Sequence, residues 1–220
     1  MKDKRLNRSL LRIYNLLYAR FGPRHWWPGD TKIEIILGAI LTQNTAWANV
    51  EKAIENLKKE KVLAVNKLSG ISEKKLARLI RPSGYYNIKA DRIKNFLRFL
   101  NTRYQGSIDK MFRSRLYKLR EELLAVKGIG RETADSILLY AGDKPIFVVD
   151  AYTKRVFSRH GFINKDADYE ETQALFMDNL GKNKRLFNEF HALIVELGKF
   201  MCKSKKPLCS MCPIQRIRRK

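Results

Sequence analysis

The segment Lys127-Gly128-Ile129-Gly130 has the residue types and spacing of a turn that binds an anion. Its two glycines allow a tight turn and a close approach of the backbone to a ligand, while Ile129 can pack into the core. The amides of Gly128, Gly130 and the next residues would then face outward at the positive end of a following helix, where phosphate binds. A plain helix–turn–helix connection with glycine caps is the alternative. The basic neighbours Lys127 and Arg131 favour the phosphate site.

The net charge of the chain agrees with an anionic partner. Forty-five Lys and Arg residues stand against 22 Asp and Glu residues, a formal net charge of +23 at pH 7. Such a surplus attracts polyanions, of which nucleic acid is the commonest for a soluble protein. A soluble or thermophilic surface is the alternative, since 30% of the residues are charged. We therefore expect the turn to hold a DNA phosphate without reading base sequence.

The elements that position this turn are predicted to be helices, because apolar residues recur at intervals of three and four. A strand-like run, residues 146–149, is too short to found a sheet. We predict an all-α fold, with one helix ending near Val126 and the next starting near Arg131. The apolar helix faces are Leu6, Leu10, Ile13 and Leu17; Ile33, Ile36, Leu37, Ile40 and Leu41; Val50, Ala53, Ile54 and Leu57; Ile93, Phe96, Leu97 and Leu100; Leu116, Leu119, Leu123 and Val126; Ala134, Ile137, Leu138 and Ala141; and Phe187, Phe190, Ile194 and Leu197.

Two absences and the cysteine pattern in the sequence bear on the cellular location of the protein. No run of 18 apolar residues is present, so no transmembrane helix is expected. The first 22 residues lack a continuous apolar core and a small-residue cleavage site, so they do not read as a secretory signal. The three cysteines all lie within residues 202–212, which is no disulfide framework and indicates a reducing compartment. We expect a cytoplasmic, nucleoid-associated protein if the source is prokaryotic.

The segment from Leu124 to Asp150, LAVKGIGRETADSILLYAGDKPIFVVD, resembles the signature of the helix-hairpin-helix DNA glycosylases of base excision repair. In that signature a Gly/Pro-rich loop and an Asp follow the hairpin. The similarity to the endonuclease III-like family runs from about Ile33 to the C-terminal cysteines. It is nearest to the 3-methyladenine DNA glycosylase III branch, in which WWP, LTQNT and RPSGYYN stretches also occur.

The resemblance implies that Asp150 is the catalytic residue, because it occupies the place of the family's Asp. Breaking a base–sugar bond builds positive charge on the deoxyribose, and a carboxylate stabilises that charge or activates the attacking water. The plainer interpretation makes Asp150 the N-cap of a helix that starts at Ala151. The two roles are compatible, since a cap orients the carboxylate.

The resemblance also bears on strand cleavage. Family members that nick the strand carry a Lys two residues after the second hairpin glycine, as a Schiff-base nucleophile. Glu132 stands there and cannot form the imine, so a monofunctional enzyme without AP-lyase activity is implied. Glu132 also fits an ordinary acid in the first turn of a helix. Lys127 is a conceivable substitute nucleophile, although phosphate contact suits it better.

A base inside the duplex must be flipped into a pocket before it can be removed. The 3-methyladenine branch places the pocket walls at Trp27, Pro28 and Trp47, with Trp26 as a neighbour. Indole faces attract cations, and purines alkylated at N3 or N7 are cationic, so an alkylated purine is the expected substrate. Packing in the core is the alternative for these tryptophans.

The gap left in the duplex must be filled as well. Gln43 matches the residue that endonuclease III-like members insert, and Tyr85 matches their wedge position. An amide suits pairing with an orphaned base, and an aromatic ring suits stacking. Without the family, Gln43 would read as a solvated amide at a helix end, and Tyr86 competes with Tyr85.

The C-terminal cysteines Cys202, Cys209 and Cys212 have the spacing C-x6-C-x2-C. The endonuclease III pattern adds a fourth Cys after five more residues and binds a [4Fe-4S] cluster. Arg218 occupies that position here. Three interpretations stay open: a cluster with one non-Cys ligand, a degenerate site without metal, or zinc completed by His.

These features predict two helical lobes with a cleft between them. Residues 32–142 would form a central lobe with the hairpin (127–130), and residues 1–31 with 143–220 a second lobe with Asp150 and the cysteine loop. The expected protein is a monomeric DNA N-glycosylase that hydrolyses damaged, alkylated purines from double-stranded DNA, with no membrane partner. The alternatives are an endonuclease III-like glycosylase for oxidised pyrimidines or mismatched bases, and a non-catalytic DNA-binding protein that keeps the hairpin.

Overall fold

In the computed structural model, which describes residues 3–24, 26 and 29–218, the chain folds into helices joined by short loops, and these residues form no strand. The predicted all-α fold is confirmed. No helix in this part of the chain has the length and apolar character needed to cross a membrane. The helices and helical turns are α1 (Lys4–Phe21), α2 (Lys32–Leu41), α3 (Trp47–Lys59), α4 (Val65–Gly70), α5 (Glu73–Leu79), η1 (Arg81–Ser83), α6 (Tyr86–Tyr104), α7 (Ile108–Arg113), α8 (Leu116–Leu124), α9 (Arg131–Ser136), η2 (Ile137–Ala141), α10 (Ala151–Arg159), α11 (Tyr169–Met177), α12 (Lys184–Phe200) and η3 (Cys209–Met211).

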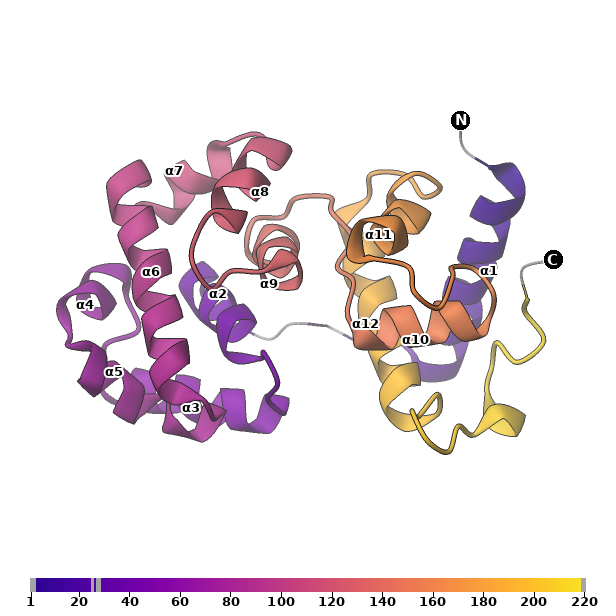
Figure 1. The fold of residues 1–220 in the computed structure, drawn as a ribbon, viewed down its shortest axis with the longest axis horizontal. Coiled ribbons are helices and arrows are strands. Elements are labelled where there is room, and N and C mark those ends of the chain that lie inside the picture. The colour runs from indigo at the N-terminus through magenta and orange to yellow at the C-terminus, as the bar shows by residue number, and fades with distance from the viewer. Residues whose placement is uncertain (1–2, 25, 27–28, 219–220) are drawn as a thin grey trace. The chain divides into compact units, whose positions relative to one another are not determined.

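The chain divides into two compact units. Trp27–Lys144 is continuous in sequence and contains α2 to η2; we call it the hairpin unit. Met1–Trp26 and Pro145–Lys220 together form the other, with α1 and α10 to η3; we call it the Asp150 unit. In Figure 1 the hairpin unit runs from purple to pink, and the Asp150 unit combines indigo with orange and yellow.

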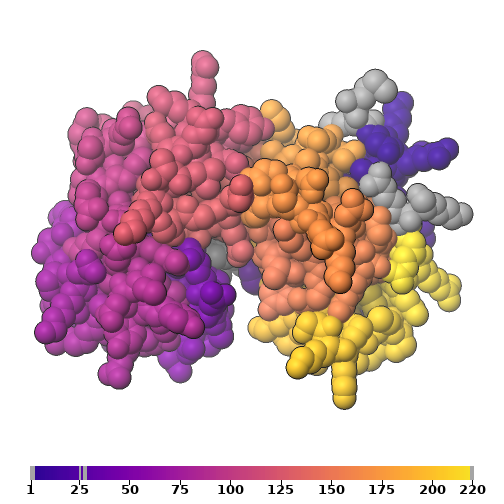
Figure 2. Space-filling model, in the orientation of Figure 1, coloured from indigo at the N-terminus to yellow at the C-terminus, as the bar shows by residue number. Residues whose placement is uncertain are grey.

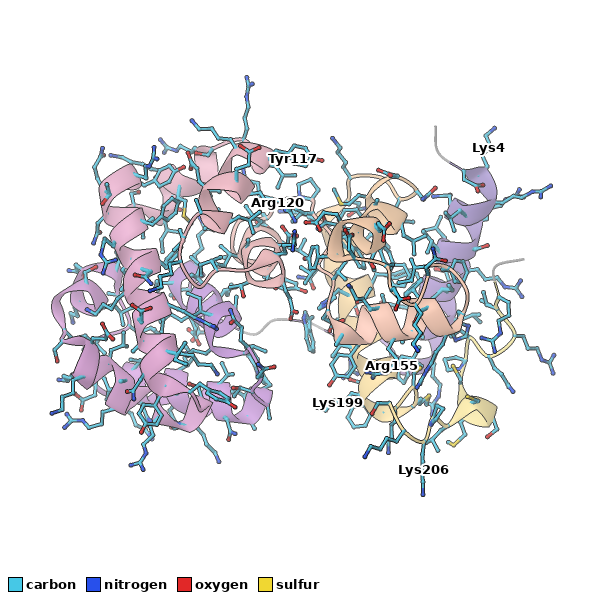
Figure 3. The ribbon with its side chains drawn as sticks, viewed as in Figure 1. Lys4, Tyr117, Arg120, Arg155, Lys199 and Lys206 are labelled. Carbon is cyan, nitrogen blue, oxygen red and sulfur yellow. The ribbon has the colours of Figure 1, made fainter. Side chains whose placement is uncertain are left out.

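The hairpin unit is built around α2 and α6. Nearly all of α2 is apolar and buried, because α3, α6, α9 and η2 all pack against it. The helices on either side of the hairpin, α8 and α9, are joined by a bidentate ion pair in which Arg120 (Figure 3) contacts both carboxylate oxygens of Asp135, at 2.7 and 3.1 Å. Asp135 is fully buried, so this pair holds the two helices at one fixed spacing.

The Asp150 unit has an aromatic core. Phe147 stacks on Phe176 with ring centroids 3.7 Å apart, and Phe187 and Phe190 of α12 meet Phe147 edge-on. Both α1 and α10 pack against α12. Such large buried rings supply much of the apolar area that stabilises a small unit.

The run at residues 146–149 is extended and buried, and it leads directly into Asp150. The described part of the chain forms no sheet that could satisfy the backbone of this run. The side chain of Gln173 donates to the carbonyl of Phe147 at 2.6 Å, and the amide of Val149 donates to the hydroxyl of Tyr169 at 3.3 Å. Side chains of α11 thus take the place of a neighbouring strand.

The C-terminal segment after α12 lies against α10 (Figure 2). Arg155 of α10 donates to the carbonyls of Gly198 and Cys202, and Arg159 donates to those of Lys203 and Ser204. Lys206, near the middle of this segment, points away from the ribbon (Figure 3). The segment is therefore fixed by α10 while Lys203, Lys205 and Lys206 stay exposed.

Candidate functional site

The hairpin requires glycine at Gly128 for a reason internal to the protein. Its φ is +91°, in the region that favours glycine, and a Cβ there would lie 2.3 Å from Cγ of Arg92. Ile129 is 4% exposed and packs into the core, as expected of the residue between the glycines. Helix α8 ends at Leu124, two residues before the predicted end, and α9 starts at Arg131 as predicted.

Gly130 differs, because nothing inside the unit demands glycine there. Its φ is −90°, and a Cβ would meet no atom within 4 Å. Within the described residues, the amides of Gly128 and Gly130 donate no hydrogen bond. Exposed Lys127 and Arg131 flank them. Two amides and two cations at the start of a helix form a surface suited to a phosphate.

The side chain of Gln43 is bonded to α6 and to α9, the helix that follows the hairpin. Its side-chain oxygen accepts a hydrogen bond from Arg92, and its amide nitrogen donates to the hydroxyl of Thr133 in α9 at 2.6 Å. Arg92 is also the residue that lies against Gly128. A third hydrogen bond joins α6 to the hairpin itself, because the side chain of Asn95 donates to the carbonyl of Lys127 at 3.2 Å. The interpretation of Gln43 as a solvated amide at a helix end is therefore wrong, since α6 connects this side chain to the turn.

Arg92 and Asn95 were not singled out in the sequence. A basic or amide residue on a long helix ordinarily lies on a solvated face, and no motif distinguishes these two. Only the spacing of three residues between them places both on the side of α6 that carries the hairpin.

The structure separates Tyr85 from Tyr86. Tyr85 is 70% exposed, whereas Tyr86 begins α6 and is half-buried. Tyr85 also has a left-handed backbone, with φ +46° and ψ +32°, directly after Gly84 at φ +64°. Such a conformation is costly for a bulky residue and persists only where neighbours hold it. The exposed ring is therefore displayed by a constrained backbone.

Asp150 caps α10, as the sequence predicted. Its Oδ1 accepts from the amide of Thr153 at 2.7 Å and from the Thr153 hydroxyl at 2.8 Å, while its Oδ2 lies 3.6 Å from Nε2 of His191. Burial raises the pKa of the Asp150 carboxyl, but His191 and the Thr153 hydrogen bonds lower it by more, so that pKa falls below its usual value. The carboxylate is therefore ionised at neutral pH although its side chain is only 12% exposed.

His191 is the neighbour of Asp150 that the sequence analysis missed. It lies on the buried face of α12, four residues after Phe187. Its ring meets Phe147 edge-on at 6.4 Å and Trp26 edge-on at 6.5 Å between centroids. A histidine on an otherwise apolar helix face was the available signal. Its ring joins Asp150 and Trp26 in one constellation.

The predicted base-pocket residues are placed only in part. Trp27 and Pro28 lie outside the described residues. Trp26 is half-buried beside His191 in the Asp150 unit. Trp47 begins α3 in the hairpin unit, and its indole donates to the carboxylate of Glu51 at 2.8 Å.

The three cysteines line one cavity of about 210 Å³ in the Asp150 unit, with Arg159, His160 and Arg218. Among the described residues no three His, Cys, Asp or Glu side chains converge on a position for a single metal ion. Burial raises the pKa of the Cys212 thiol above its usual value. Arg218 donates to the carbonyl of Arg159 at 2.5 Å and is cationic, so it is no iron ligand. The donor set is thus incomplete for a four-thiolate cluster.

Comparison with known proteins agrees with these features. The model of the HhH-GPD superfamily of base excision DNA repair proteins matches residues 37–182. A protein of Methanocaldococcus jannaschii, named provisionally as a DNA repair glycosylase, is 49% identical over 217 residues, which are 98% of this chain and 97% of that protein. Endonuclease III of Thermotoga maritima is 32% identical over 178 residues, 81% of this chain and 78% of that one.

Solved structures show the same likeness. The crystal structure of the 3-methyladenine DNA glycosylase of H. pylori, bound to 1,N6-ethenoadenine, has a TM-score of 0.74 and 34% identity, and covers 88% of this chain and 97% of its own. A non-covalent endonuclease III–DNA complex has a TM-score of 0.82 over 97% of this chain and 95% of its own, at 24% identity, and so shows the shared fold.

The chain belongs to the HhH-GPD superfamily of base excision DNA repair proteins. Within that superfamily it is a DNA glycosylase, as the Methanocaldococcus jannaschii relative and the H. pylori glycosylase support.

The two hairpin glycines offer a matched pair of substitutions. Gly128→Ala places a Cβ against Arg92 and strains φ, so we expect lower stability in a urea titration together with weaker DNA binding. Gly130→Ala meets no atom of the protein, so we expect unchanged stability but about ten-fold weaker binding of duplex DNA, measured by fluorescence anisotropy at fixed salt, because the methyl group obstructs a phosphate. Full affinity in Gly130→Ala would contradict the phosphate site.

Proposed function

We propose that the protein is a monofunctional DNA glycosylase that hydrolyses alkylated purines of the 3-methyladenine type, with Asp150 as its catalytic carboxylate. The observation that carries the proposal is that Asp150 is both nearly buried and ionised. It is a nearly buried acid whose pKa is held below its ordinary value, next to His191 and Trp26 and at the end of the buried run that follows the hairpin unit. Perturbed acids of this kind cluster at catalytic sites.

Hydrolysis of the bond between base and deoxyribose requires little more than this carboxylate and a water molecule. As the base leaves, positive charge develops on the deoxyribose, and an ionised carboxylate in a poorly solvated place stabilises that charge strongly. Thr153 binds Oδ1 through two hydrogen bonds, so the carboxylate does not have to reorganise during the reaction. Water then adds to the sugar and leaves an abasic site.

An alkylated purine is favoured by two lines of support. The H. pylori glycosylase, 34% identical over 88% of this chain, binds a modified adenine in its crystal structure. Trp26 lies beside the Asp150–His191 pair, where an indole face can attract a base made cationic by alkylation. Such a base is already a good leaving group, so a single carboxylate suffices.

Base release without strand cleavage follows from Glu132. This residue lies exposed in the first turn of α9, at the place where strand-cleaving relatives carry a lysine nucleophile. A carboxylate forms no imine with the sugar. An endonuclease III-like activity on oxidised pyrimidines or mismatched bases is the second candidate, favoured by the 32% identity to the Thermotoga maritima endonuclease III.

Two helix caps in the Asp150 unit separate catalysis from stability. Asp150 caps α10 and Asp168 caps α11, each from an extended backbone and each accepting from the amide three residues further on. Each Asp→Asn change should cost little stability, because Asn also caps well. We expect Asp150→Asn to lower single-turnover base release at least 100-fold with DNA affinity retained, and Asp168→Asn to leave release within two-fold. Equal rates in the two variants would remove Asp150 from the reaction.

Replacement of His191 should shift the pH dependence of base release. The reaction needs ionised Asp150, so its rate falls as the pH drops through the pKa of that carboxyl. Burial raises that pKa and His191 opposes the rise, so His191→Gln moves the acid limb of the pH–rate profile to higher pH. The control is His160→Gln, a second buried histidine, whose ring bonds the carbonyl of Ile217. A profile that moves equally in both variants, or in neither, would contradict this account.

The proposed substrate and the absence of lyase activity are tested with one set of duplexes that carry 3-methyladenine, 7-methylguanine, thymine glycol or a T·G mismatch. We expect release of the methylated purines and strand breaks only after alkali. Incubation with borohydride should trap no covalent adduct with the wild type, whereas Glu132→Lys supplies the missing amine as a matched comparison. Cleavage of the thymine glycol duplex alone would select the endonuclease III-like alternative, and a wild-type adduct would show a bifunctional enzyme.

A further inference from the structure

Lys89 is a buried cation that binds three oxygens from two separate loops. Its side chain is 1% exposed, and its Nζ donates to the carbonyl of Leu41 at 2.8 Å, to the Thr45 hydroxyl at 2.5 Å and to the carbonyl of Ser83 at 2.7 Å. An ammonium has three donors and no acceptor, so all its hydrogen bonds are used. Burial, with Arg92 nearby, lowers the pKa of Lys89 to about 8. Burying a lysine is costly, and three matched acceptors offset that cost.

The two loops that Lys89 joins are those that display Gln43 and Tyr85. Leu41 and Thr45 bracket Gln43 at the end of α2, and Ser83 ends η1, two residues before Tyr85. The Thr45 hydroxyl also donates to the carbonyl of Ser83 at 2.6 Å, so the loops are bonded to each other as well.

Both loops need such support. Asn44 and Tyr85 each have a left-handed backbone, with φ of +53° and +46°. These conformations persist only when the surrounding structure holds them. The ammonium also lies against the last carbonyl of α2, where the helix dipole favours a cation. Removal of Lys89 would leave three buried acceptors without their donor.

We infer that Lys89 is a positioning residue that keeps the Gln43 and Tyr85 loops in the relative placement needed to enter the duplex together. The inference rests on the proposed function and on the expectation from the sequence that these two side chains fill the space left by an extruded base. Lys89 itself touches no DNA in this account. Replacing Lys89 should therefore weaken the recognition of a site that lacks a base and not the binding of intact duplex DNA.

Lys94 provides a matched control on the same helix. It lies five residues further along α6 and donates to the carbonyls of Leu68 at 2.8 Å and Ser69 at 3.0 Å, and to that of Ile71. Burial lowers its pKa as well. It thus performs the same structural task at the end of α4, in a loop that carries none of the candidate DNA contacts. Lys94 is half-buried whereas Lys89 is buried, but a general cost of losing a lysine that bonds three loop oxygens should appear at both positions.

The test uses a duplex with a tetrahydrofuran abasic analogue opposite 2-aminopurine, and the same duplex without the analogue. This probe reports entry into the gap whichever base the enzyme removes. The wild type, Lys89→Met and Lys94→Met are compared at a temperature at which melting curves show all three folded. Thr45→Val removes one of the three acceptors of Lys89 and the hydrogen bond to Ser83. It is a second, milder test of the same inference if Lys89→Met does not fold.

We expect Lys89→Met to reduce the preference for the abasic duplex at least ten-fold and to suppress the 2-aminopurine fluorescence change, with affinity for intact duplex within two-fold of the wild type. Thr45→Val should change both quantities in the same direction, and Lys94→Met should change neither. Equal losses in Lys89→Met and Lys94→Met, or an unaltered preference in Lys89→Met, would overturn the inference. A wild type without preference for the gap would instead refute the proposed insertion of Gln43 and Tyr85.

Discussion

One row of polar side chains on α6 holds the parts of the hairpin unit that we assign to DNA. Lys89, Arg92 and Asn95 are spaced three residues apart, and each bonds residues of these loops or of the turn. Lys89 binds the loops around Gln43 and Tyr85, Arg92 binds Gln43 beneath the first hairpin glycine, and Asn95 binds the turn itself. Because these groups are buried or half-buried, their hydrogen bonds fix geometry more firmly than surface contacts would.

A different constraint governs the Asp150 unit. A carboxylate buried away from water tends to become protonated, and a protonated Asp150 could not stabilise a cation. Thr153 and His191 counter this tendency from opposite oxygens, at the point where the buried extended run meets α10. The run must be buried to bring Asp150 into an apolar environment, and Gln173 and Tyr169 make this tolerable by bonding its backbone.

Much of the architecture could be predicted, because apolar spacing alone indicates which helix faces are buried. The turn at Gly128–Gly130, the burial of Ile129 and the cap at Asp150 also follow local rules of glycine and capping chemistry. The hydrogen-bond partners of Gln43 could not be predicted, since nothing in LTQNT shows that its amide bonds Arg92 and Thr133, 49 and 90 residues away. His191 was missed because a histidine on an apolar helix face most often only packs.

The sequence by itself determined the helical class, the superfamily and the helix cap at Asp150, since each depends on residue types at short spacing. Only the tertiary structure decided which cationic side chains are buried and structural and which face solvent. It also decided that the protein itself requires glycine at Gly128 and not at Gly130. Finally, it decided that His191 and Thr153 keep Asp150 ionised. The physical reason is that burial and pKa depend on groups brought together from distant parts of the chain. Lys89 shows this most clearly, because its three acceptors lie up to 48 residues away and no local pattern connects them.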